Sequence, residues 1–174
     1  EYFRRANLVY HTSYGDSAIA LQLAESLLAS YPEPTVDAIA RTSRSYAILA
    51  FYRLGCFRRI SALAREEWKV NDSNGSLYFA EYFGTIAIDT LIAAGQLRLA
   101  RELMRDLERS FERRGLSEQV HTTNYYLVSA MLAMFDKQYE RAKRELELGR
   151  DSIAEGLVPR IRLAYHAYAC RVER

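Results

Sequence analysis

Apolar residues recur along the chain at helical spacing, and the same arrangement returns about every forty residues. Gly15, Gly55 and Gly95 stand forty residues apart, and Lys137 takes the corresponding place forty-two residues after Gly95. After each of these four turn positions, apolar residues follow at intervals of mostly three and four, which places them on one face of a helix. These residues are Ala20, Ala24 and Leu27; Ile60 and Ala64; Ala100, Met104 and Leu107; and Ala142 and Leu146. The pattern predicts a helix after each turn, with charged side chains on its outer face.

A first helix is predicted before each turn. Small or apolar residues stand seven and eight positions before the turn, where they let the two helices of a hairpin approach closely. They are Leu8 with Asn7, Ile48 with Ala47, Ile88 with Ala87, and Ala130 with Ser129. Glycine can adopt a positive φ and end the first helix, so Gly95 is predicted to be the hinge of a hairpin without a chemical role. Lys137 predicts a fourth turn that is built differently or that costs some stability.

A fixed period of this size is typical of helical solenoids. Clusters of turn residues divide the chain into hairpins at 1–34, 35–75, 76–116 and 117–157, followed by a half-repeat at 158–174. The predicted fold is therefore all-α, a right-handed superhelix, or solenoid, of four helical hairpins plus a terminal half-repeat, in a single domain. We expect the chain to be a piece of a longer protein.

Composition narrows the function classes. With 49% hydrophobic residues the chain can build a core, and eight Gly and three Pro are few for a sandwich or barrel. A net charge of +2, from 24 basic and 22 acidic residues, argues against nucleic-acid binding by this segment. The two cysteines, Cys56 and Cys170, lie far apart, which favours reduced thiols. Since no membrane-spanning apolar run is present either, we expect a soluble cytoplasmic protein without membrane contact.

The repeat resembles the tetratricopeptide repeat family, in a variant with a long period, and the resemblance covers essentially the whole chain. Gly15 is followed by Ala20 and later by Pro32, as in the second half of that repeat, and Gly95 with Ala100 matches it in part. The chain departs from the family in its longer period, against about 34 residues. The residue also differs at the first-helix position where the family has tryptophan. In this chain that position holds Arg4, Arg44, Gly84 and Tyr126.

The resemblance implies that the first helices line a concave groove. Residues thirteen, ten, six and three before each turn would then face inward: Tyr2, Arg5, Val9 and Thr12; Thr42, Ser45, Leu49 and Tyr52; Tyr82, Thr85, Asp89 and Ile92; Asn124, Leu127, Met131 and Met134. From these and the neighbouring Arg53 we select the candidate partner-binding residues Arg5, Tyr52, Arg53, Tyr82, Thr85, Asp89, Asn124 and Met131. Each of the tyrosines either contacts a ligand or packs between neighbouring units.

No catalytic or metal-binding arrangement emerges from the sequence. His11, His121 and His166 are too far apart to form a local metal pair, and His166 with Cys170 supplies only two ligands. Cys56 has arginines beside it but no general base nearby. We therefore expect no enzymatic activity, no metal and no cofactor.

The pattern favours a non-catalytic scaffold that binds a protein or peptide segment in its groove. The alternative is a sensory or oligomerisation segment of a larger transcription regulator, similar to the maltose-activator type, which binds an effector and controls a neighbouring domain. The half-repeat would expose apolar residues such as Ile161, Tyr165 and Tyr168. We therefore expect self-association through it or a continuation of the array.

Overall fold

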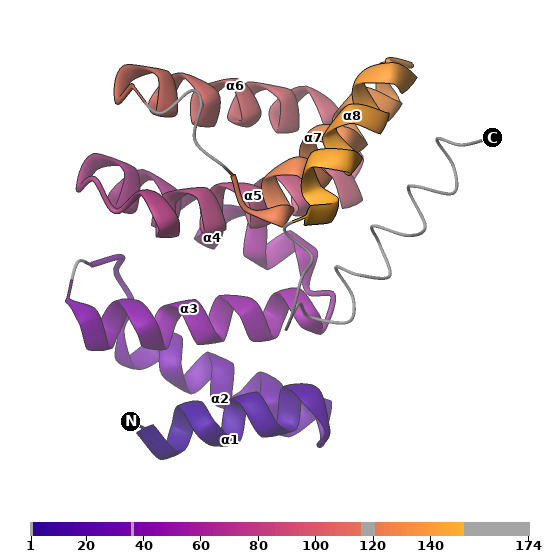
Figure 1. Ribbon diagram of the computed structural model, residues 1–174. Coiled ribbons are helices and arrows are strands. Elements are labelled where there is room, and N and C mark those ends of the chain that lie inside the picture. The colour runs from indigo at the N-terminus through magenta and orange to yellow at the C-terminus, as the bar shows by residue number, and fades with distance from the viewer. Residues whose placement is uncertain (1, 36, 116–120, 152–174) are drawn as a thin grey trace. The chain divides into compact units, whose positions relative to one another are not determined.

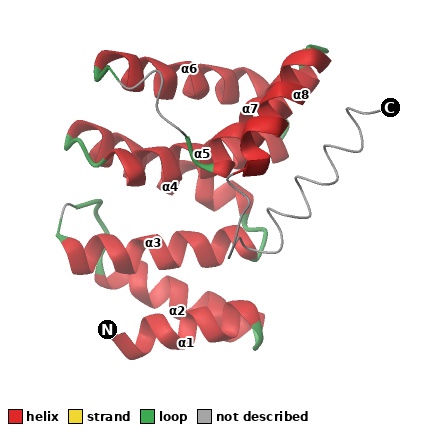
Figure 2. Cartoon of the chain, viewed as in Figure 1, coloured by secondary structure: helices red, strands yellow, loops and turns green. Residues whose placement is uncertain are grey.

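A computed structural model describes residues 2–35, 37–115 and 121–151 of the chain (Figure 1). Within these residues the secondary structure consists of eight helices and no strands (Figure 2), which confirms the predicted all-α class. The helices are α1 (Tyr2–Ser13), α2 (Ser17–Ser30), α3 (Ala38–Arg53), α4 (Phe57–Ser73), α5 (Leu77–Ala93), α6 (Leu97–Arg113), α7 (Thr123–Phe135) and α8 (Tyr139–Asp151). The predicted half-repeat at 158–174, and with it the expected self-association surface, lies outside the described residues.

The chain divides into two compact units, Glu1–Ala94 and Gly95–Arg174. The first unit contains α1 to α5. In it α1 packs on α2 and α3, α2 packs on α3, and α4 packs on both α3 and α5. The second unit contains α6, α7 and α8, and α7 packs on both of the others. The sequence predicts a single domain, whereas the division between units falls at Gly95, between the two helices of the predicted third hairpin.

The apolar stripe predicted for each second helix is buried. α2, α4, α6 and α8 each begin two residues after the turn position, and the stripe residues five, nine and twelve positions after it lie in the core. The partners predicted on the first helices are buried too, except for the exposed Asn7. Burial of such a stripe is the main source of stability for helices of this length.

The turns confirm the predicted hinge geometry at two glycines. Gly55 and Gly95 adopt φ values of 76° and 72°, in the left-handed region that a side chain disfavours. Lys137 adopts the same conformation with a φ of 58°. The amide of Gln138 donates to the carbonyl of Ala133 at 2.8 Å, as the amide of Cys56 does to Phe51 at 3.0 Å. The fourth turn is therefore built like the second, with a lysine in a position that favours glycine.

Gly15 differs from this prediction, because its φ is not positive. A β-carbon at this position would stand 2.4 Å from Nδ1 of His11 and 2.9 Å from its Cα. The reason for glycine here is the close approach of His11, whose Nδ1 also accepts a hydrogen bond from the amide of Asp16 at 3.3 Å. Asp16 in turn caps α2 by accepting from the amide of Ala18 at 2.6 Å.

Hairpin 2, formed by α3 and α4, contains a buried ion pair between the position eleven before the turn and the position twelve after it, the second of which is leucine in hairpins 1 and 3. The side chains of Arg44 and Glu67 are both fully buried, and Nε of Arg44 donates to the carboxylate of Glu67. Nη1 of Arg44 also donates to the carbonyls of Tyr31 at 2.7 Å and Pro32 at 2.6 Å. Arg44 thereby ties the loop after α2 to the interior of hairpin 2.

Candidate functional site

Two first helices of the first unit, α3 and α5, are joined by side-chain contacts at both ends. Near the start of α3, the guanidinium of Arg41 lies 4.5 Å from the ring centroid of Phe79, and its Nη1 donates to the hydroxyl of Ser76 at 3.4 Å. Near the end of α3, the hydroxyl of Tyr52 donates to the carboxylate of Asp89. Because early residues of α3 meet early residues of α5 and late residues meet late ones, the two helices run in the same direction.

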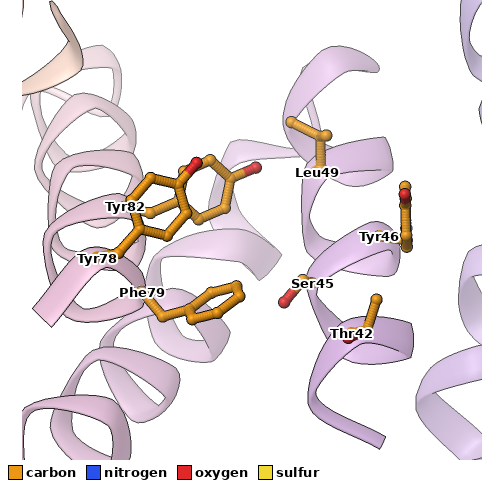
Figure 3. A pocket seen from close by; sticks show the side chains of 7 residues that line it. All are labelled: Thr42, Ser45, Tyr46, Leu49, Tyr78, Phe79 and Tyr82. Carbon is orange, nitrogen blue, oxygen red and sulfur yellow. The ribbon is translucent and has the colours of Figure 1, made fainter. Parts of the chain in front are cut away.

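Between these two contacts the helices enclose a cavity of about 300 Å³. Thr42, Ser45, Tyr46 and Leu49 of α3 and Tyr78, Phe79 and Tyr82 of α5 line it. Figure 3 shows the three rings of α5 projecting toward α3, with the ring of Phe79 directed at Ser45. A volume near 300 Å³ is at the small end of ligand sites and is large enough for a bulky side chain of a partner.

The rings of α5 are held in a fixed mutual arrangement. Tyr78 and Tyr82 are one helical turn apart, and their rings are nearly parallel, with an interplanar angle of 9° and centroids 6.5 Å apart. The ring of Phe79 stands edge-on to that of Tyr78, at 83° and 5.4 Å. Tyr78 nevertheless keeps 66% of its surface exposed. This side of the cavity therefore offers aromatic faces that contact one another and remain accessible to a ligand.

The electrostatic environment keeps the Tyr82 hydroxyl protonated. Burial raises the pKa of Tyr82 to about 12, although the positive charge of Arg53 acts in the opposite direction. The phenol is therefore a hydrogen-bond donor at neutral pH. Nε of both Arg41 and Arg53 is buried without a hydrogen-bond partner.

The hydroxyls on the α3 side are already committed as donors. Oγ1 of Thr42 donates to the carbonyl of Ala38 at 2.6 Å, and Oγ of Ser45 donates to the carbonyl of Arg41 at 2.7 Å. Their lone pairs remain available, so this wall of the cavity can accept hydrogen bonds from a ligand. The α5 side of the cavity thus provides aromatic rings and one hydrogen-bond donor, the Tyr82 hydroxyl. The α3 side provides two hydroxyls that can accept hydrogen bonds.

Four of the residues selected from the sequence come together at this cavity. Tyr82 lines it, and Tyr52 and Asp89 form the hydrogen bond at its end. Arg53 influences the pKa of Tyr82 and donates from Nη1 to the hydroxyl of Ser13 at 3.4 Å. Arg5, on α1, is half-buried, and its Nε has no hydrogen-bond partner.

The other three selected residues are placed differently. Thr85 is only 1% exposed, and its Oγ1 donates to the carbonyl of Tyr82 at 3.0 Å, so it supports α5 from within. Met131 is 5% exposed and Asn124 is half-buried, and both lie on α7 of the second unit. None of these three is among the residues that line the cavity between α3 and α5.

Sequence reasoning missed Tyr46, Tyr78 and Phe79 as lining residues, and also Arg41. A signal for two of them is present, because Phe79 and Tyr78 stand three and four residues before Tyr82 and so share its helical face. Tyr46 is adjacent to the predicted Ser45 and reaches the same cavity. The inward-facing positions implied by the resemblance form a narrow stripe on each helix. Side chains as large as tyrosine reach the cavity from positions beside that stripe.

Residues considered for other chemistry occupy structural positions. The ring of His121 stacks on Tyr125 with centroids 3.9 Å apart, and Cys56 is a half-buried free thiol in the second turn. His166 and Cys170 lie outside the described residues. In the described ranges, no group of three or more His, Cys, Asp and Glu side chains is placed to hold a metal ion. None of the helices in these ranges combines the length and the apolar character that crossing a membrane requires.

Comparison of the chain with protein-family models, with curated proteins and with solved structures yields no match.

Proposed function

We propose that the chain is a non-catalytic interaction module that binds an extended segment of another protein in the cavity between α3 and α5. The observation that carries this proposal is the ordered set of aromatic faces at Tyr78, Phe79 and Tyr82, left accessible between two braced helices. We further propose that the hairpins form a right-handed solenoid of the tetratricopeptide type. Supporting this, α1, α3 and α5 are first helices of successive hairpins, and α1 packs on α3.

The chemistry around the cavity indicates which segment would bind. A bulky apolar side chain fits against the aromatic wall, where its burial contributes on the order of 2 kcal/mol. Arg41 at one end and Arg53 near the other provide positive charge. A segment with one aromatic or branched apolar residue and a neighbouring Asp or Glu is therefore complementary in both shape and charge.

Selection from a random peptide display library on the 174-residue chain tests this proposal. We expect enriched sequences to carry an apolar anchor beside an acidic residue. Replacing Tyr82→Ala or Tyr78→Ala is expected to weaken binding of a selected peptide by about 1–3 kcal/mol, measured by calorimetry, because each removes one aromatic contact. Tyr52→Ala is expected to have a similar effect, since it releases Asp89 at the end of the cavity.

Tyr14→Ala is the matched control, because Tyr14 is 85% exposed and lies after α1, outside the lining of the cavity. Circular dichroism of every variant shows whether the helices remain. The proposal fails if no peptide is enriched, or if selected peptides bind the Tyr78 and Tyr82 variants as tightly as the Tyr14 variant.

A further inference from the structure

The second unit contains a cavity of its own, with very different chemistry. It has a volume of about 300 Å³ and lies among α6, α7 and α8. Its apolar lining consists of Met104, Leu132 and Ala133. Its polar lining consists of Arg101, Arg105, Glu108, Ser129, Asp136 and Arg141. Three arginines against two carboxylates leave the lining with an excess of one positive charge.

The three arginines are not equally engaged. Arg101 is paired with Asp136. It donates to the Asp136 carboxylate from Nε, at 3.3 Å, and also from Nη2. Arg141 approaches Glu145 at 3.6 Å and Glu108 at 3.9 Å, and both distances exceed that of a good hydrogen bond. Two guanidinium groups are thus not held by a short ion pair, and one of them is Arg141, which is paired only at longer distances with its two carboxylates.

The other is Arg105, which points to the same cavity from α6. Its Nε donates to the backbone carbonyl of Arg101 at 3.3 Å, so its terminal nitrogens are not used by that bond. Glu108 lies one turn further along α6, and burial raises its pKa while the charge of Arg141 lowers it.

A buried hydroxyl completes the polar lining. Ser129 is only 2% exposed, yet its Oγ forms no hydrogen bond with another group of the described chain. A buried hydroxyl without a hydrogen bond is energetically unfavourable, so its presence in a cavity wall indicates a site for a polar partner. A ligand oxygen in the cavity would supply one.

We propose that this cavity binds a small organic monocarboxylate. The carboxylate would accept hydrogen bonds from Arg105, Arg141 and the Ser129 hydroxyl, and the apolar part of the ligand would pack on Met104, Leu132 and Ala133. The carboxylates of Glu108 and Asp136 in the lining oppose a phosphate dianion more strongly than they oppose a monoanion. The volume suits a small molecule, and the site is independent of the cavity between α3 and α5. It is the kind of site that a sensory segment would need.

Titration followed by amide NMR of the 174-residue chain tests this inference. The probes are a series of small monocarboxylates from acetate to benzoate, the neutral primary amide of each, and inorganic phosphate. We expect at least one carboxylate to shift amides of α6, α7 and α8 in a saturable way at millimolar concentration, while its amide and phosphate do not. Arg105→Gln is expected to weaken this binding about tenfold or more, because it removes a charge-assisted hydrogen bond.

Arg109→Gln is the matched control, since Arg109 is an exposed arginine of the same helix that pairs with Asp106 outside the cavity lining. Ser129→Ala is expected to weaken carboxylate binding severalfold without loss of fold, because it removes only an unpaired hydroxyl. The inference is overturned if no carboxylate binds, if the amides or phosphate bind equally well, or if the Arg105 and Arg109 variants behave alike.

Discussion

Hairpin 2 and hairpin 4, formed by α3 with α4 and by α7 with α8, build the same contact from opposite chemistry. In hairpin 2, the position eleven before the turn is Arg44 and the position twelve after it is Glu67, and the two form a fully buried ion pair. In hairpin 4 the same two positions are Tyr126 and Gly149. A β-carbon on Gly149 would stand 3.0 Å from Cβ of Tyr126, so the aromatic residue occupies the space that glycine leaves.

In these two hairpins the charged residue faces an opposite charge and the large residue faces glycine. The same two positions of hairpin 1 hold the exposed Arg4 and the buried Leu27, so an arginine at the first position does not by itself require a carboxylate at the second. The ion pair adds something the second solution lacks, because Arg44 also holds the carbonyls of Tyr31 and Pro32 from the preceding hairpin. Hairpin 2 therefore depends on its neighbour within the first unit, whereas Tyr126 and Gly149 form a contact inside hairpin 4.

Breaking the ion pair should have the largest effect. Arg44→Ala is expected to lower the free energy of unfolding by about 3–5 kcal/mol, because it leaves Glu67 buried without its cation. Urea denaturation measures the change. The double variant Arg44→Met with Glu67→Leu, which replaces both charges with apolar side chains, should recover most of the loss.

Arg98→Ala provides the comparison for a surface pair, since Arg98 contacts Glu102 at 2.9 Å on an exposed face of α6. Its loss should cost less than about 1 kcal/mol. If Arg44→Ala cost no more than Arg98→Ala, the buried pair would have no structural role.

Filling the space in hairpin 4 should have a smaller effect. Gly149→Ala gains helix propensity of about 1 kcal/mol but meets Cβ of Tyr126, which is attached directly to the backbone and cannot rotate away. We expect a net loss of about 1 kcal/mol in the free energy of unfolding. A gain in stability would mean that α7 and α8 can separate slightly, and that the pairing of Tyr126 with Gly149 is not required.

The turns of the two hairpins sharpen the comparison further. Gly55 and Lys137 share a left-handed conformation that costs a residue with a side chain about 1 kcal/mol. Lys137→Gly should therefore raise the melting temperature, and Gly55→Ala should lower it, since nothing lies within 4 Å of a β-carbon there and only the backbone conformation opposes it. Lys143→Gly, in the exposed middle of α8, should instead destabilise the chain.

The smallest expected effect is a change of stability with pH that is caused by Tyr82 of α5, in the cavity beside hairpin 2. The pKa of Tyr82 is raised from 10.0 to about 12, so between these values the unfolded chain releases a proton that the folded chain retains. Stability associated with this group is present below about pH 10 and is lost as the pH rises. From about pH 9 to 10.5, wild type should lose roughly 1 kcal/mol or less relative to Tyr82→Phe in urea denaturation. Equal losses would place the Tyr82 hydroxyl in water.

Much of the helical framework was predictable, because it depends on local periodicity. The second helices begin at the predicted positions, and the turn at Gly55 has the backbone conformation that glycine favours. The conformation of Lys137 was not predictable, because its own preference opposes it and the packed helices on either side impose it. The reason for Gly15 was also hidden, since it lies in the space occupied by His11.

The candidate site was predictable only in part. Tyr52, Tyr82 and Asp89 could be chosen because the resemblance implies which positions before each turn face inward, and helical spacing keeps these positions on one face. The reach of Tyr78, Phe79 and the guanidinium of Arg41 depends on where α5 stands beside α3, which no local pattern contains. The unpaired hydroxyl of Ser129 was likewise visible only after three helices had been brought around it.

The amino-acid order alone determined the class of structure, the spacing of the helices and which face of each is buried, because these follow from 3.6 residues per turn and from the transfer of apolar surface out of water. Tertiary packing decided that Arg44 pairs with Glu67 and that Thr85 of α5 is buried. It also decided that aromatic side chains of α5 line a cavity beside α3. Those outcomes depend on the distances between helices. These distances are determined jointly by residues that lie far apart in the chain.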